Sequence, residues 1–197
     1  MSAVEGNSRY TYLVMNYKLK DIKSDKIIIF DLDDTLVKTD AKIRILDAKT
    51  HEVIKELTPE EFNNFVKKKS HIMDFDDFDS PSLLRQGKVI HEIFGILKDS
   101  YGKGIPVAIL TARSDSELVR NFFLENGIDI HPDLVIAIND PQFKYKGTIA
   151  ERKKKAIEDL VDSGYKELTF FDDNEDNLKL AKEVTGYKDA DIKTIHV

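Results

Sequence analysis

The sequence predicts an α/β protein built on a parallel sheet, and three observations lead to this prediction. From residue 82 onward, short apolar runs alternate with helical patterns of roughly 10 to 20 residues, which is the layout of right-handed β-α-β units. An earlier run, residues 27–30, is wholly apolar and suits a strand that is buried on both faces of such a sheet. At 197 residues, the chain suits one domain with an insertion.

The segments that flank the first predicted strand are less regular. Residues 8–24 fit both a strand and a helix. Residues 42–54 predict a hairpin, because two β-rich arms flank a turn, and residues 58–61 predict a helix start with a capping Thr, a Pro and a Glu. The acidic, aromatic stretch 73–80 is expected to be a loop, with a lid that excludes water as the alternative. We interpret residues 39–80 as an insertion after the first strand.

The later elements follow one another in a regular order. We expect helices near residues 83–101, 114–125, 148–163 and 174–185, and strands at residues 106–110, 134–138, 168–171 and 192–197. Ser114 to Glu117 is interpreted as a capping box at the start of the second of these helices. Strands that alternate with helices in this way predict a sheet whose strands run parallel.

Polar residues follow the ends of three predicted strands. They are Asp31, Asp33 and Thr35; then Thr111 and Arg113, with Ala112 between them; and last Asp172, Asp173 and Asn177. In a doubly wound sheet the carboxyl ends of the strands converge on one crevice. Crowded carboxylates repel one another unless a cation or protonation relieves them, and Mg²⁺ is held by carboxylates together with phosphate oxygens. The pattern therefore predicts a Mg²⁺-dependent site for phosphoryl transfer.

A lysine-rich helix precedes the fourth strand of the predicted sheet and supplies a cation for the phosphate charge. Lys153 shares a helical face with Ala150 and Ile157, because the spacing between them is three and four residues. That face meets the sheet, so Lys153 is the preferred candidate and Lys154 is the second. Lys155 is expected to be solvated.

These residues resemble the motifs of the haloacid dehalogenase (HAD) superfamily of phosphohydrolases. Residues 31–35 match D-x-D-x-T after an apolar strand, and Thr111 stands where a Thr or Ser follows the second strand. Lys153 corresponds to the motif lysine, and residues 172–173 form the Asp-Asp pair after a later strand. The resemblance covers most of residues 27–197 outside the insertion.

The resemblance implies a fold. It is a three-layer α/β/α Rossmann-like core with a central parallel sheet in the order 5-4-1-2-3. Residues 1–197 would form a single HAD-like domain, and the insertion at about residues 39–80 would be a flap or small cap. Because such a cap is small, the crevice would remain open to bulky phosphoesters.

The resemblance also implies a role for each residue. Asp31 would attack phosphorus and form an aspartyl phosphate, and Asp33 would act first as a general acid and then as a general base. Thr111 and the amide of Ala112 would bind the phosphoryl group. Mg²⁺ would be held by Asp31, the backbone carbonyl of Asp33, and Asp173. The residues that would orient these ligands and the lysine are Thr35, Asp172 and Asn177.

Two residues beside these motifs are interpreted separately. Arg113 either faces the substrate, as a binding residue beside Lys153, or pairs with an acidic side chain, and the sequence leaves both open. Asp34 is expected only to shape the turn after the first strand, at a position where many relatives have Gly.

Composition excludes several classes of protein. The chain has no cysteine, which rules out disulfides, thiolate metal sites and cysteine nucleophiles. No apolar run approaches the roughly 18 residues of a membrane helix, and residues 1–9 lack the layout of a secretory signal, so a cytoplasmic location without membrane contact is expected. The net charge of −6 argues against broad nucleic-acid binding. No obligate protein partner is expected.

The sequence therefore predicts a Mg²⁺-dependent phosphatase. Its phosphoester substrate would be a nucleotide, a nucleic-acid end or a small phosphorylated metabolite. A polynucleotide 3′-phosphatase is a sharper alternative, which the two-Asp motif favours and the net charge disfavours. The alternative from another class is a binding module on a HAD scaffold without catalysis, which the full set of motif residues disfavours.

Overall fold

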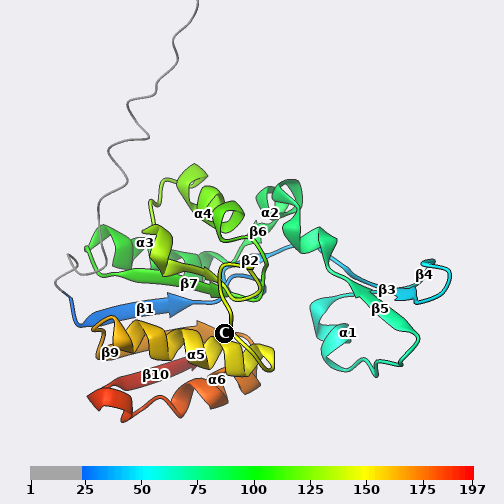
Figure 1. The fold of residues 1–197 in the computed structure, drawn as a ribbon. Helices are drawn as coiled ribbons and strands as arrows, with labels where there is room; N and C mark the ends of the chain where they lie inside the picture. The colour runs from blue at the N-terminus through cyan, green and yellow to red at the C-terminus, as the bar shows by residue number, and fades with distance from the viewer. Residues whose placement is uncertain (1–23) are drawn as a thin grey trace, which may run out of the picture.

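The central sheet has five parallel strands in the order β10-β9-β1-β7-β8 (Figure 1). The strands are β1 (Lys26–Phe30), β7 (Val107–Thr111), β8 (Val135–Ala137), β9 (Glu167–Asp172) and β10 (Asp191–His196). The structure is a computed structural model that describes residues 24–197. The ambiguous segment 8–24 therefore lies outside the described residues except for Ser24.

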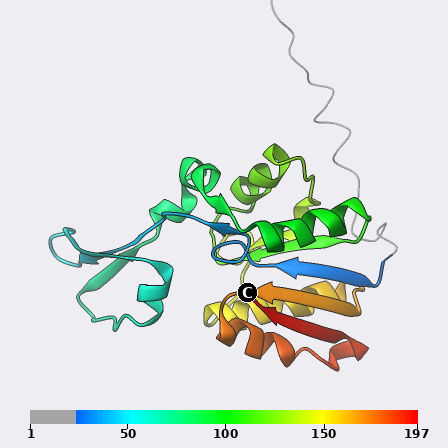
Figure 2. The ribbon, with the colours of Figure 1, turned by 180° about the vertical axis from the view of Figure 1, so that it is seen from behind.

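Helices flank this sheet on both faces. They are α3 (His91–Gly102), α4 (Ser116–Glu125), α5 (Ile149–Asp162) and α6 (Glu175–Lys182). Figure 1 shows α5 in front of the sheet, and Figure 2, from behind, shows α3 in front of it. Every residue of β7 is buried, as expected for a strand that is covered on both sides. The predicted class, an α/β protein with a parallel central sheet, is confirmed.

The predicted helix over residues 83–101 is wrong. The structure has a short helix, α2 (Pro81–Gln86), then β6 (Lys88–Val89), and only then α3. The strand β6 pairs with β2 (Val37–Lys38), which brings Gly87 so close to β2 that a Cβ there would lie 2.5 Å from Val37 Cγ1. The break is thus caused by pairing with a distant segment.

The insertion forms a second, smaller sheet in the order β4-β3-β5. Its elements are β3 (Ile43–Asp47), β4 (Val53–Leu57), α1 (Pro59–Asn63), β5 (His71–Asp74) and the 3₁₀ helix η2 (Asp76–Asp79). The predicted hairpin is confirmed, and so is the capping box at the start of α1. Its own small core consists of Ile43, Ile45 and Leu57 with four partly buried side chains from α1, the loop after it, β5 and η2. In Figure 1 this sheet lies beyond the carboxyl ends of β1 and β9.

Two further expectations are corrected. The stretch from residue 73 does not begin as a loop, because residues 71–74 are β5, which pairs with β3. Ser114 does not open a capping box: Asp115 caps α4 by accepting from the Leu118 amide at 2.8 Å, and the Ser114 hydroxyl donates to Asp79 instead.

Within residues 24–197, no helix combines the length and the apolar character that a membrane crossing requires.

Candidate functional site

The carboxyl ends of β1, β7 and β9 bring the predicted polar residues together. These three strands are neighbours in the sheet, and the Asp31 amide donates to the Phe171 carbonyl at 2.9 Å. Asp31 directly follows β1, Thr111 ends β7 and Asp172 ends β9. All three are buried, so their polar groups depend on partners within the protein.

Lys153 lies at the centre of this cluster. Its Nζ is 2.8 Å from Asp31 Oδ1 and 2.7 Å from Asp172 Oδ2, and the side chain is 2% exposed. Burial by itself lowers the pKa of Lys153, but Asp31 and Asp172 outweigh it and raise that pKa above its ordinary value. The ammonium group is therefore charged. Lys154 and Lys155 point elsewhere and pair with carboxylates outside the cluster.

Asp172 is held in place by several donors besides Lys153. Both of its carboxylate oxygens accept from Asn177 Nδ2, at 3.0 and 3.1 Å. The Asn174 amide donates to the same carboxylate at 2.8 Å. These contacts fix the rotamer of Asp172, which in turn fixes the ammonium group of Lys153. The predicted positions of Asp172 and Asn177 beside the catalytic candidates thus agree with the geometry.

A divalent cation fits the carboxylates of Asp31, Asp172 and Asp173. Each offers an oxygen, and the three oxygens lie within 4.8 Å of one another. Burial, followed by the nearby carboxylates, raises the pKa of Asp31 well above its ordinary value, although Lys153 opposes this shift. Burial and Asp172 likewise raise the pKa of Asp173. Three carboxylates share one lysine here, and a hard cation would offset the excess of negative charge.

Within this triad, Asp31 and Asp173 are better placed as metal ligands than Asp172, whose oxygens already accept from Lys153 and Asn177. Thr35 is fully buried, and its hydroxyl donates to Asp173 Oδ1 at 3.4 Å. That contact joins the first motif to the last across 138 residues of sequence. The carboxylate of Asp33 lies outside the triad.

Arg113 holds Asp33 instead. Its Nε and Nη2 donate to the two carboxylate oxygens of Asp33 at 2.9 and 2.7 Å. Its Nη1 donates to the carbonyl of Phe78 in the insertion, and its guanidinium carbon lies 5.6 Å from the centre of the Phe78 ring. Of the two roles left open for Arg113, pairing with an acid is therefore the one that the structure contains.

The turn between Asp33 and Thr35 agrees with the expectation for Asp34. Asp34 has φ of 58°, in the left-handed region, and its amide donates to the Val37 carbonyl at 3.0 Å. Asp tolerates this conformation better than most residues. Asp34 thus shapes the turn that presents Asp33 and Thr35.

The rim of the site beside β7 contains residues that the motifs did not identify. The carbonyl of Ala112 accepts from Asn139 Nδ2, and Asn139 Oδ1 accepts from Arg152 Nη1. The Thr111 hydroxyl accepts from the Arg113 amide at 3.3 Å. Asn139 follows β8 and Arg152 lies in the first turn of α5, so two further segments reach this rim.

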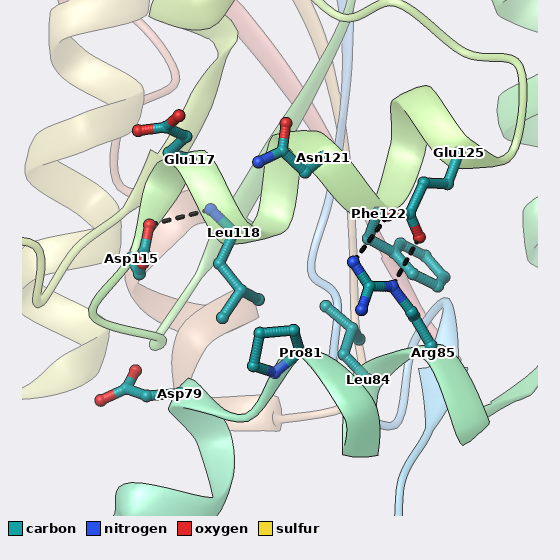
Figure 3. Close-up of a pocket in the computed structure, with 10 residues that line it drawn as sticks. All are labelled: Asp79, Pro81, Leu84, Arg85, Asp115, Glu117, Leu118, Asn121, Phe122 and Glu125. Carbon is teal, nitrogen blue, oxygen red and sulfur yellow. Dashed lines mark hydrogen bonds and ion pairs between the residues drawn. The ribbon is translucent and has the colours of Figure 1, made fainter.

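A cavity of about 270 Å³ is lined by none of the clustered residues (Figure 3). It is a groove between α2 and α4, and several of its polar groups have partners within the protein. Arg85 donates to both carboxylate oxygens of Glu125 at 2.8 and 2.7 Å, and Asp115 caps its own helix. None of the site residues predicted from sequence lines this groove.

No family model matches the sequence, and neither does any curated protein. The function therefore has to be inferred from the side chains at the ends of β1, β7 and β9.

Proposed function

We propose that this protein is a Mg²⁺-dependent phosphatase of the HAD type, which hydrolyses phosphomonoesters through an aspartyl phosphate. One observation carries the proposal: Lys153 is buried between Asp31 and Asp172, with Asp173 close enough to share a cation. Counted along the chain, the strand order β10-β9-β1-β7-β8 reads 5-4-1-2-3, which supports the HAD assignment. The substrate would be a nucleotide, a nucleic-acid end or a small phosphorylated metabolite.

The chemistry follows from where charge develops. Asp31 would attack phosphorus in line, so that the P–O bond to the leaving group breaks as the aspartyl phosphate forms. Lys153, 2.8 Å from Asp31, and the buried Thr111 hydroxyl would bind the phosphoryl oxygens and stabilise their charge. In its protonated form, Asp33 would give a proton to the leaving oxygen, and as the carboxylate it would later take one from the water that hydrolyses the intermediate. When bound by Asp31, Asp173 and the Asp33 carbonyl, Mg²⁺ would neutralise phosphate charge.

Turnover of p-nitrophenyl phosphate tests this proposal. We expect hydrolysis with Mg²⁺, loss of activity with EDTA, and recovery when Mg²⁺ is added in excess, because the three carboxylates bind phosphate poorly without a cation. Asp173→Asn should likewise lose activity, because it removes a proposed ligand of Mg²⁺. If no divalent cation supports turnover of p-nitrophenyl phosphate or of a broad panel of phosphoesters, the protein is a binding module and the proposal fails.

Arg113 is expected to act as a positioning residue for Asp33. Arg113→Ala should lower kcat/KM by about 10- to 100-fold, since general acid-base help is worth roughly 10²–10⁴-fold and Asp33 would lose its two-point support. Arg113→Lys should not restore it, because an ammonium group cannot donate in the same fork. The measurement is kcat/KM for alkyl phosphates beside p-nitrophenyl phosphate.

Substrates with different leaving groups distinguish a positioning role of Arg113 from a general loss of structure. Alkoxide is a poor leaving group and needs the acid more than p-nitrophenolate does, so Arg113→Ala should slow alkyl phosphates more. Equal losses on both substrates would contradict the role. Arg85→Ala is the matched control, because it removes a similar two-point pair with Glu125 on an exposed surface, where such pairs contribute little.

A further inference from the structure

A second cation lies at the rim of the site. Arg152 immediately precedes Lys153 in α5, and its guanidinium is held by two oxygens: the Asn139 amide oxygen, which accepts from Nη1, and the Thr148 carbonyl, 3.4 Å from Nε. Asn139 in turn donates to the carbonyl of Ala112. One side chain therefore connects the guanidinium of Arg152 to the end of β7, where the phosphoryl group is expected to bind.

Arg152 differs from the other arginines that the structure describes. Each of those forms an ion pair with a carboxylate; they are Arg44, Arg85, Arg113 and Arg120. Arg152 contacts only neutral oxygens among the described residues. Its positive charge therefore has no carboxylate partner at a place where a charged substrate would arrive.

The acids next in sequence to Arg152 and to Asn139 are engaged with other donors. Glu151 accepts from the Thr148 amide at 2.7 Å, within the capping box of α5. Asp140 accepts from the Ser116 amide at 3.1 Å and from the Gln142 amide at 3.0 Å. These bonds hold both carboxylates in place. Neither is free to rotate toward Arg152 and neutralise its guanidinium.

We propose that Arg152 binds a second anionic group of the substrate, adjacent to the phosphomonoester that is cleaved at Asp31. The inference rests on the proposed function and narrows its substrate class. An arginine offers a planar fork that matches phosphate oxygens, and charge-assisted bonds of this kind are stronger than neutral ones. A phosphodiester next to a 3′-phosphate and the second phosphate of a sugar bisphosphate share this chemistry.

The test compares substrates with and without the second charge. One pair is a 3′-phosphorylated dinucleotide and a nucleoside 3′-monophosphate, and the other is fructose 1,6-bisphosphate and fructose 6-phosphate. For at least one pair, the wild-type kcat/KM should be about 10- to 100-fold higher for the doubly charged member, the range of one or two charge-assisted bonds. Arg152→Gln should reduce that ratio to near one, and the pair that responds identifies the source of the second charge.

Lys154→Gln is the matched control, because it also removes one positive charge from α5 but at a residue that pairs with Glu183. It should keep the wild-type ratio. A wild-type ratio near one for both pairs, or a ratio that Arg152→Gln leaves unchanged, would overturn the inference while leaving the phosphatase proposal intact. If the wild type turns over no phosphoester, binding is measured instead. The same compounds are titrated onto the Asp31→Asn variant and onto the double variant Asp31→Asn, Arg152→Gln. Equal affinities of the two variants would overturn the proposed role of Arg152.

Discussion

Asp31→Asn is expected to lower kcat by several orders of magnitude while the fold stays intact. The amide has nearly the shape of the carboxylate, but it cannot attack phosphorus, so no aspartyl phosphate forms. Lys153 keeps Asp172 as a partner. Because burial and neighbouring acids already disfavour the charged form of Asp31, its neutral replacement should leave the midpoint of thermal unfolding unchanged or higher.

Two measurements check this expectation: turnover of p-nitrophenyl phosphate, and thermal unfolding followed by circular dichroism. Asp34→Asn is the matched control in the same loop, since Asn tolerates the left-handed conformation at residue 34 as Asp does. It should retain most of the activity. Near-wild-type turnover by Asp31→Asn would remove Asp31 as the nucleophile, and unfolding of that variant at ambient temperature would show that the carboxylate is structural.

The fold class was predictable because its signals are local. The run that became β1 is apolar at each position from 27 to 30, and β7 is buried throughout, so both give the pattern of strands that helices cover on both faces. The cap of α1 was also readable, because a threonine and a glutamate three residues later satisfy each other without help from the rest of the chain.

Local signals could not have predicted that the helix expected over residues 83–101 is interrupted between α2 and α3. Its interruption depends on β2, which lies about 50 residues earlier in the chain and pairs with Lys88 and Val89. Gly87 allows the close approach to Val37, but a single glycine within a helical pattern is an ambiguous signal. A long-range contact outweighed the local preference.

The same distinction explains which site residues were found. Asp31, Thr111 and Asp172 end neighbouring strands, so the rule that ligands bind at the carboxyl ends of the strands brings them together. The contact between Arg113 and Phe78 joins residues 35 positions apart, and Phe78 belongs to the short 3₁₀ helix η2 of the insertion. No periodic pattern encodes such a pair, because it depends on how the insertion packs against the core.

Lys153→Ala is expected to impair both catalysis and stability. The ammonium group is the only cation within hydrogen-bond distance of Asp31 and Asp172 among the described residues, and all three side chains are buried. Removing one partner from a buried ion pair leaves an uncompensated charge, which costs about 3–5 kcal/mol of folding free energy. Turnover should fall further than the loss of folding free energy alone would cause, since the phosphoryl oxygens also lose the ammonium group that would stabilise their charge.

Urea unfolding in the presence of EDTA measures the stability term without a cation that could replace the ammonium group. Lys153→Met should lose nearly as much folding free energy as Lys153→Ala, because it keeps most of the aliphatic chain and removes only the charge. Lys155→Ala is the control on the same helix: its pairs with Glu158 and Asp159 are largely exposed, and such pairs contribute roughly 0–1 kcal/mol. If Lys155→Ala were instead the more damaging change to turnover or to stability, the buried triad around Lys153 would not be the functional centre of this protein.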